Sequence, residues 1–136
     1  MTSFESLGLQ ESLITAVKKL GFENPMPIQQ QIIPLLLQEE CKDIIALAQT
    51  GTGKTAAFGL PIIQKTNTKS KKVEYLILSP TRELCLQIAD DLKDYSVNTP
   101  NINIAAVFGG SSMDRQIQKI KQGAQIISAT SSSCLK

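Results

Sequence analysis

Residues 44–58 read IIALAQTGTGKTAAF, an apolar run followed by a glycine-rich turn that ends in Gly-Lys-Thr. Glycines let consecutive backbone N–H groups curl around an anion, and a helix that begins at such a turn adds its positive end. We expect these donors at Gly51, Thr52, Gly53 and Lys54. The Lys54 ammonium would reach the β and γ phosphates of a nucleotide, and the Thr55 hydroxyl would ligate Mg²⁺. The stretch therefore predicts a phosphate-binding loop.

The common form of this loop begins with Gly, where this chain has Ala48. The alternative is a glycine-rich turn that arose by chance. We favour the phosphate site because the turn follows a predicted strand at 43–48 and precedes a predicted helix at 55–64, which is the context such a loop requires.

Composition sets limits on the class of protein. The chain has 136 residues, 42% of them hydrophobic, and a formal net charge of +2, which by itself does not indicate a nucleic-acid partner. No apolar run approaches the roughly 18 residues of a membrane span, and residues 1–10 do not resemble a secretory signal. Cys41, Cys85 and Cys134 are far apart, as is typical of reduced thiols. We therefore expect a cytoplasmic protein with no membrane contact.

The chain contains no His, so His-based acid–base chemistry and Ser-His-Asp catalysis are excluded for these residues. Strand-like and helix-like patterns alternate along it, which predicts an α/β fold with a mostly parallel sheet. The predicted strands cover 43–48, 75–79, 104–108 and 125–130, and the predicted helices cover 10–20, 27–40, 55–64, 83–95 and 113–122.

A second signal precedes the loop. Residues 21–29 read GFENPMPIQ. The Gln29 amide can accept from N6 and donate to N7 of adenine at once, and the Phe22 ring can stack on a base. The alternatives are a helix-surface glutamine and a core phenylalanine.

Four motifs stand in the order and approximate spacing of the first domain of DEAD-box RNA helicases: Phe4 with GFENPMPIQ, then AQTGTGKT, then PTREL at 80–84, then Gly109-Gly110. Residues 4–130 resemble that family, which usually has Ala at the position of Ala48. The resemblance implies a RecA-like P-loop domain that binds ATP with Mg²⁺. It implies nucleotide contacts from Phe4, Phe22, Gln29, Ala48, Gln49, Thr50, Gly51, Thr52, Gly53, Lys54 and Thr55, with Thr55 on the metal.

The same resemblance implies contacts to an RNA backbone. These contacts would come from Pro80, Thr81, Arg82, Gly109, Gly110 and Thr130. A helix start after a strand offers free N–H groups to a phosphate, and a Gly pair permits close backbone approach. The equally weighted alternative is that Thr81 is only an N-cap, Arg82 forms a surface salt bridge and the Gly pair is a plain turn.

The resemblance ends near residue 130. Ser131, Ser132 and Ser133 stand where the family has Pro, Gly and Arg, so 131–136 is an atypical tail. Ser128-Ala129-Thr130 spells a later helicase motif, but we interpret it as the ordinary fourth strand. No Asp-Glu-Ala-Asp segment is present, so the catalytic set is not complete and only Lys54 and Thr55 of it are present. We expect 1–136 to be a partial helicase ATP-binding domain, incomplete at its C-terminus, with 1–40 recognising adenine.

Three functions stay open at this point. The first is the ATP-binding portion of an RNA helicase whose full protein opens or remodels RNA. The alternatives are a stand-alone P-loop NTPase and a non-catalytic nucleotide- or RNA-binding module. We expect the protein to be a monomer, and we expect this chain alone to bind nucleotide weakly without hydrolysis. We also expect it to be marginally stable or prone to aggregate, because apolar strands would lack neighbours.

Overall fold

A computed structural model describes residues 2–49, 51, 53–110 and 112–131. The chain divides into two compact units, residues 1–65 with 94–99, and residues 66–93 with 100–136. Each unit is described by itself. In the described part of the chain, no helix has both the length and the apolar character needed to cross a membrane.

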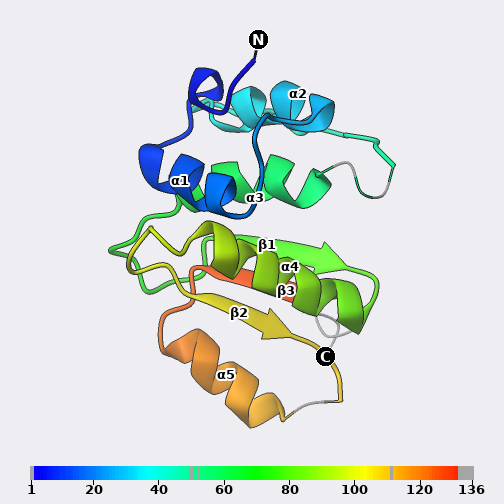
Figure 1. The fold of residues 1–136 in the computed structure, drawn as a ribbon. Helices are drawn as coiled ribbons and strands as arrows, with labels where there is room; N and C mark the ends of the chain where they lie inside the picture. The colour runs from blue at the N-terminus through cyan, green and yellow to red at the C-terminus, as the bar shows by residue number, and fades with distance from the viewer. Residues whose placement is uncertain (1, 50, 52, 111, 132–136) are drawn as a thin grey trace. The chain divides into compact units, whose positions relative to one another are not determined.

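The first unit is helical (Figure 1). It contains the 3₁₀ helix η1 and the α-helices α1, α2 and α3, at Glu5–Leu7, Glu11–Lys19, Pro27–Leu36 and Lys54–Lys65. α1 buries Leu13, Ile14 and Val17 at helical spacing, and Gly21 follows it with a φ of 95°, as expected for a helix end. The predicted helix at 10–20 is therefore confirmed.

The core of this unit is built from large side chains of α1, α2 and α3 and of the residue that precedes η1. Phe4, Leu13, Ile33, Leu60 and Ile63 are each at most 1% exposed. Outside the core, the Lys18 ammonium donates a 2.6 Å hydrogen bond to Glu5, which ties η1 to α1 and holds the pKa of that carboxyl below its ordinary value. The start of α2, which lies in the GFENPMPIQ motif, and the start of α3, which follows the glycine-rich loop, thus belong to one packed unit.

Helix α2 ends at Leu36, four residues before the predicted end at residue 40. Lys65, at the end of α3, donates hydrogen bonds of 2.9 Å to the carbonyl oxygens of Leu36 and Gln38. A lysine on the last carbonyls of a helix satisfies acceptors that have no partner within the helix. This tertiary contact marks the end of α2, and the sequence pattern of α2 alone does not contain it.

The predicted strand at 43–48 is wrong. No strand is formed there, and in the described structure none of its residues pairs with β1, β2 or β3. Ile45 and Leu47 are both 91% exposed. A buried strand needs neighbours that take its backbone hydrogen bonds and cover its side chains. The described residues supply neither, so the apolar run stays extended and unpaired.

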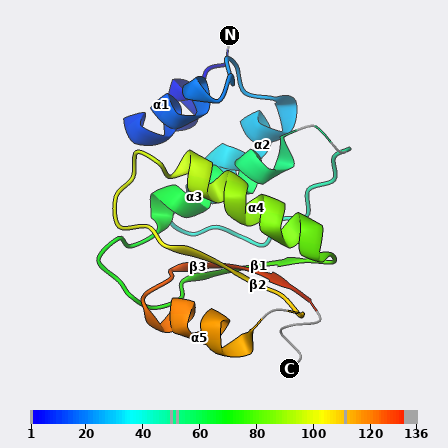
Figure 2. The same ribbon diagram turned by 60° about the horizontal axis from the view of Figure 1, so that its bottom comes forward.

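The second unit is a parallel three-stranded sheet with the strand order β1-β3-β2. Its elements are β1, α4, β2, α5 and β3, at Tyr75–Ser79, Arg82–Tyr95, Ile104–Val107, Met113–Lys121 and Ile126–Thr130. The last two residues of α4 fall in the first unit. Figure 2 shows α4 and α5 on opposite faces of the sheet. The predicted α/β class with a parallel sheet is confirmed, and β2 is one residue shorter than expected.

The central strand β3 is buried along its whole length. Within it, the Ser128 hydroxyl donates a 2.9 Å hydrogen bond to the Cys85 carbonyl, and the Cys85 thiol donates to the Ser128 carbonyl at 3.1 Å. Both side chains are fully buried. This pair fastens α4 to the sheet, so Ser128 has a structural role here, in agreement with the interpretation of 125–130 as an ordinary strand.

Candidate functional site

The glycine-rich loop leads directly into helix α3. Gly51 and Gly53 have φ angles of 78° and 80°, in the left-handed region that favours glycine. The Ala57 N–H donates to the Gly53 carbonyl at 3.1 Å, so α3 begins immediately after Gly53. The N–H groups of the first helical turn have no partner within the helix and point toward the loop. Thr50 and Thr52 lie outside the described residues.

Lys54 reaches back across the loop. Its ammonium donates a 2.5 Å hydrogen bond to the Ala48 carbonyl, and the side chain is otherwise exposed. The Thr55 side chain is half-buried on the next position of α3. The loop therefore brings a cation, a hydroxyl and the positive end of a helix together, and these are the groups that a phosphate with a bound Mg²⁺ requires.

Gln29 connects the preceding segment to this loop. Its side chain is 2% exposed. Oε1 accepts a hydrogen bond from the Met26 N–H at 2.9 Å, and Nε2 donates to the Gly53 carbonyl at 3.2 Å. A glutamine amide has a second lone pair and a second hydrogen for further partners. The alternative of a helix-surface glutamine is wrong, because Gln29 is buried beside the loop.

The two phenylalanines of this segment have different environments. Phe22 is half-buried, and its ring centroid lies 6.3 Å from that of Tyr95 at an interplanar angle of 51°, a tilted aromatic pair. Phe4 is fully buried in the helical core. Phe22 thus lies partly at the surface of the unit, and Phe4 lies in its core.

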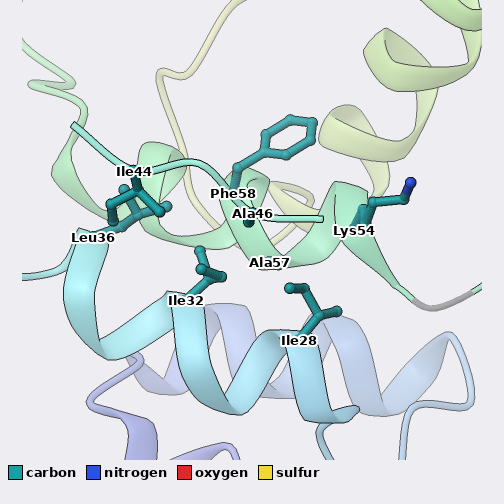
Figure 3. A pocket seen from close by; sticks show the side chains of 8 residues that line it. All are labelled: Ile28, Ile32, Leu36, Ile44, Ala46, Lys54, Ala57 and Phe58. Atoms are coloured by element: carbon teal, nitrogen blue, oxygen red, sulfur yellow. The ribbon is translucent and has the colours of Figure 1, made fainter. Parts of the chain in front are cut away.

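A cavity of about 400 Å³ lies beside the loop (Figure 3). Its walls are apolar apart from one lysine, and they consist of Ile28, Ile32, Leu36, Ile44, Ala46, Lys54, Ala57 and Phe58. Figure 3 shows Ile28 and Ile32 projecting from α2 toward the segment that carries Ile44 and Ala46, while the Lys54 amine points away from them. The cavity can therefore accept an apolar group, and the Lys54 ammonium of the loop lies at its margin.

A second group of residues gathers at the carboxyl edge of the sheet. Ser79 at the end of β1 pairs with Thr130 at the end of β3, and Val107 at the end of β2 pairs with Ala129. Because parallel strands end at one edge, the segments that follow β1 and β2 leave the sheet on the same side. These segments are Pro80–Arg82 and Gly109-Gly110, and all five residues are exposed. Thr130 is only 4% exposed.

Thr81 is the N-cap of α4. Its hydroxyl accepts a 3.2 Å hydrogen bond from the Leu84 N–H, and its carbonyl accepts one of 3.0 Å from Cys85. The guanidinium of Arg82 lies 4.6 Å from the centre of the Phe108 ring, within the range of a cation–π contact. The capping role of Thr81 is therefore confirmed, and Arg82 is held at the edge of the sheet by an aromatic ring.

The sequence model of the DEAD/DEAH box helicases matches residues 26–136 of the chain. The chain belongs to this family. The protein named ATP-dependent RNA helicase CshA of Listeria monocytogenes is 48% identical over 130 residues, which are 96% of this chain and 24% of that relative. This DEAD-box chain thus spans about a quarter of the length of that relative. The resemblance of residues 4–130 to DEAD-box helicases is confirmed.

Solved structures show the same fold. A DEAD box protein from Methanococcus jannaschii superposes with a TM-score of 0.92 at 37% identity, covering 99% of this DEAD-box chain and 36% of that protein. Dbp5 of Saccharomyces cerevisiae, solved with RNA and ADP BeF₃, superposes with a TM-score of 0.88 at 32% identity, covering 99% of this chain and 33% of Dbp5. The fold is that of part of a RecA-like domain, as expected.

Two residues of the sheet edge were missed by sequence reasoning. Phe108 was included only as the end of a predicted strand, and Gln116 only as one position of a predicted helix. Gln116 is 5% exposed and hydrogen-bonded to the backbone of Phe108. A glutamine nine residues after the end of β2 at Val107 carries little signal by itself. Among the described residues, no three His, Cys, Asp or Glu side chains lie close enough together to hold a metal ion.

Proposed function

We propose that this DEAD-box chain forms the ATP-binding part of an ATP-dependent RNA helicase and contributes some of its RNA contacts. One observation carries the nucleotide half of the proposal. The hydrogen bond from Gln29 Nε2 to the Gly53 carbonyl joins the segment that would read adenine to the loop that would hold the phosphates. A base and its phosphates can then be held by one packed unit.

In this proposal, Gln29 reads adenine through its remaining lone pair and hydrogen, and Phe22 stacks on the base, with the buried Phe4 supporting them. The backbone N–H groups of residues 51–54 and the Lys54 ammonium hold the phosphates. The Thr55 hydroxyl holds Mg²⁺, which would neutralise the charge of the phosphates. Lys54 would exchange the Ala48 carbonyl for a phosphate oxygen, a stronger acceptor because it is charged.

For RNA, we propose that the carboxyl edge of the second unit contacts the backbone of a single strand. Arg82 supplies a charge that can pair with a phosphate in two hydrogen bonds. The exposed pair Gly109-Gly110 allows the backbone to approach closely. Thr81 and Pro80 lie at the start of α4 and would contact the RNA backbone there. Thr130, which is buried at the end of β3, would contribute a further RNA contact.

Opening or remodelling of RNA duplexes is proposed only for the full protein. Hydrolysis requires carboxylates that hold Mg²⁺ and position water, and of the expected catalytic set the sequence carries only Lys54 and Thr55. We therefore propose that this chain alone binds nucleotide without hydrolysing it. For the full protein, a cytoplasmic location and a monomeric state likewise stay predictions.

Thermal unfolding with Mg-ADP, with Mg-GDP and without ligand tests the nucleotide site. A ligand that binds only the folded state raises the midpoint. We expect ADP to raise it and GDP to have a smaller effect, and we expect Gln29→Ala to abolish the difference between them. Gln30→Ala is the matched control, because Gln30 also donates to a backbone carbonyl, that of Pro25 at 2.9 Å, but has no hydrogen bond to the described residues of the loop.

Equal shifts by ADP and GDP in the unmodified protein would remove the adenine role of Gln29 and favour a general P-loop NTPase. No shift with either nucleotide would contradict the phosphate site itself. RNA-stimulated phosphate release by the full-length protein would support the hypothesis of a helicase over that of a non-catalytic binding module.

A further inference from the structure

Gln116 forms a two-point contact with the backbone of Phe108. Its Nε2 donates a 2.9 Å hydrogen bond to the Phe108 carbonyl, and its Oε1 accepts a 3.3 Å hydrogen bond from the Phe108 N–H. Gln116 lies in α5, and its side chain is 5% exposed. An amide that both donates to and accepts from one residue imitates the pairing of a neighbouring strand. Gln116 thus extends the pairing of β2 by one residue, just past its end at Val107.

Phe108, which Gln116 holds in this way, is in contact with Arg82 of the proposed RNA site. The Phe108 ring lies under the Arg82 guanidinium at 4.6 Å. A Cβ atom built on Gly110, two residues after Phe108, would lie 3.7 Å from an Arg82 terminal nitrogen. The Phe108 backbone therefore fixes both the ring that supports Arg82 and the start of the loop that carries Gly109-Gly110.

We infer that Gln116 is a positioning residue for RNA binding. By fixing the backbone of Phe108 it sets the position of the Arg82 guanidinium and of the Gly109-Gly110 loop against an RNA phosphate. This inference rests on the proposed RNA function of Arg82. Gln116 itself touches the protein backbone, and its effect on RNA passes through Phe108 and Arg82.

The test is a double-mutant cycle on RNA affinity in the full-length protein, with a fluorescent single-stranded oligonucleotide at several salt concentrations. We expect Arg82→Ala to weaken binding roughly tenfold, about one charge-assisted hydrogen bond, and to lower the salt slope by about 0.7, one phosphate contact on a single strand. We expect Gln116→Met to reproduce most of both changes. In the Arg82→Ala background, Gln116→Met should cost little more, because residues acting through one contact are not additive.

Gln125→Met is the matched control. Gln125 is also buried, and its amide accepts from the Asn103 N–H at 2.8 Å and donates to the Asn101 and Ser70 carbonyls, near the amino ends of the strands. Its loss should lower stability without changing the salt slope. Phe108→Leu keeps an apolar side chain but removes the ring beneath Arg82, so it should also lower RNA affinity. This variant tests the inference if Gln116→Met fails to fold.

The outcomes separate the inference from the function on which it rests. If Arg82→Ala leaves RNA affinity unchanged, the proposed RNA role is wrong and the inference falls with it. If Arg82→Ala weakens binding while Gln116→Met and Phe108→Leu do not, only the inference is wrong. Additive losses in the cycle, or an equal change of the salt slope in Gln125→Met, would also overturn it by assigning Gln116 a general structural role.

Discussion

At the scale of single residues, Gly53 carries one constraint that Gly51 does not share. Both have positive φ, but a Cβ atom at Gly53 would overlap the Gln29 amide nitrogen, whereas none of the described residues beyond its chain neighbours lies within 4 Å of one at Gly51. We predict that Gly51→Ala lowers the free energy of unfolding by about 1 kcal/mol, the cost of a non-glycine residue in the left-handed region. Gly53→Ala should lower it by about 2–3 kcal/mol, since it also displaces the Gln29 hydrogen bond.

Urea unfolding of the two variants measures this difference. The double variant Gly53→Ala with Gln29→Ala removes the clash, so the two changes should cost less together than the sum of their separate costs. Equal costs for Gly51→Ala and Gly53→Ala would show that the Gln29 amide does not constrain the loop.

Other single residues show where sequence reasoning stops. The glycines and Lys54 could be predicted, because a phosphate loop needs those residue types at fixed spacing. The burial of Gln29 and the role of Gln116 could not be predicted from residue type. Each amide is bonded to a backbone carbonyl in another segment, Gly53 and Phe108 respectively, and a backbone group leaves no mark in the sequence.

At the scale of elements, the start of α4 carries two roles that one substitution can separate. Thr81 caps the helix, and in the proposed function it also lies next to an RNA phosphate. Asp is as good an N-cap as Thr but adds a negative charge. We predict that Thr81→Asp keeps the free energy of unfolding within about 0.5 kcal/mol of the original and weakens RNA binding by about tenfold or more, because the carboxylate repels the phosphate.

Chemical denaturation and RNA titration of the same preparations check this prediction. Thr81→Ala is the complementary control, since it removes the cap without adding charge and should cost about 1 kcal/mol of stability. Unchanged RNA affinity in Thr81→Asp would mean that the start of α4 serves the fold alone.

Elements also differ in how well their sequence predicts them. The helices begin and end within a few residues of the prediction, because periodicity and end residues such as Pro27 and Gly21 act locally. The strand at 43–48 fails because an apolar run reports the side chains of a strand and says nothing about its neighbours. β3 has the same apolar character and does form, since it lies between β1 and β2.

At the scale of the whole molecule, the fold class followed from the alternation of strand and helix, but the likeness of four motifs was needed to choose among P-loop proteins. The motifs lie in both compact units: residues 21–29 and the glycine-rich loop in the first, and Pro80–Leu84 with Gly109-Gly110 in the second. The sequence shows the order and spacing of the motifs along the chain. It does not reveal which side chains are in contact within each unit.

The last prediction concerns the apolar surface of the 136-residue chain. Ile45 and Leu47 are 91% exposed in an extended, unpaired segment, and exposed apolar segments of this kind favour association between chains. We predict that the chain self-associates at micromolar to millimolar concentrations. Ile45→Lys with Leu47→Lys should weaken this association without lowering the free energy of unfolding, because neither side chain packs in the core. Val97→Lys with Leu20→Lys is the matched control, since these exposed side chains lie outside the segment and their replacement should leave association unchanged. Sedimentation at increasing concentration measures the outcome. A monodisperse original chain, or association that persists in Ile45→Lys with Leu47→Lys, would show that the unpaired segment is not the contact surface.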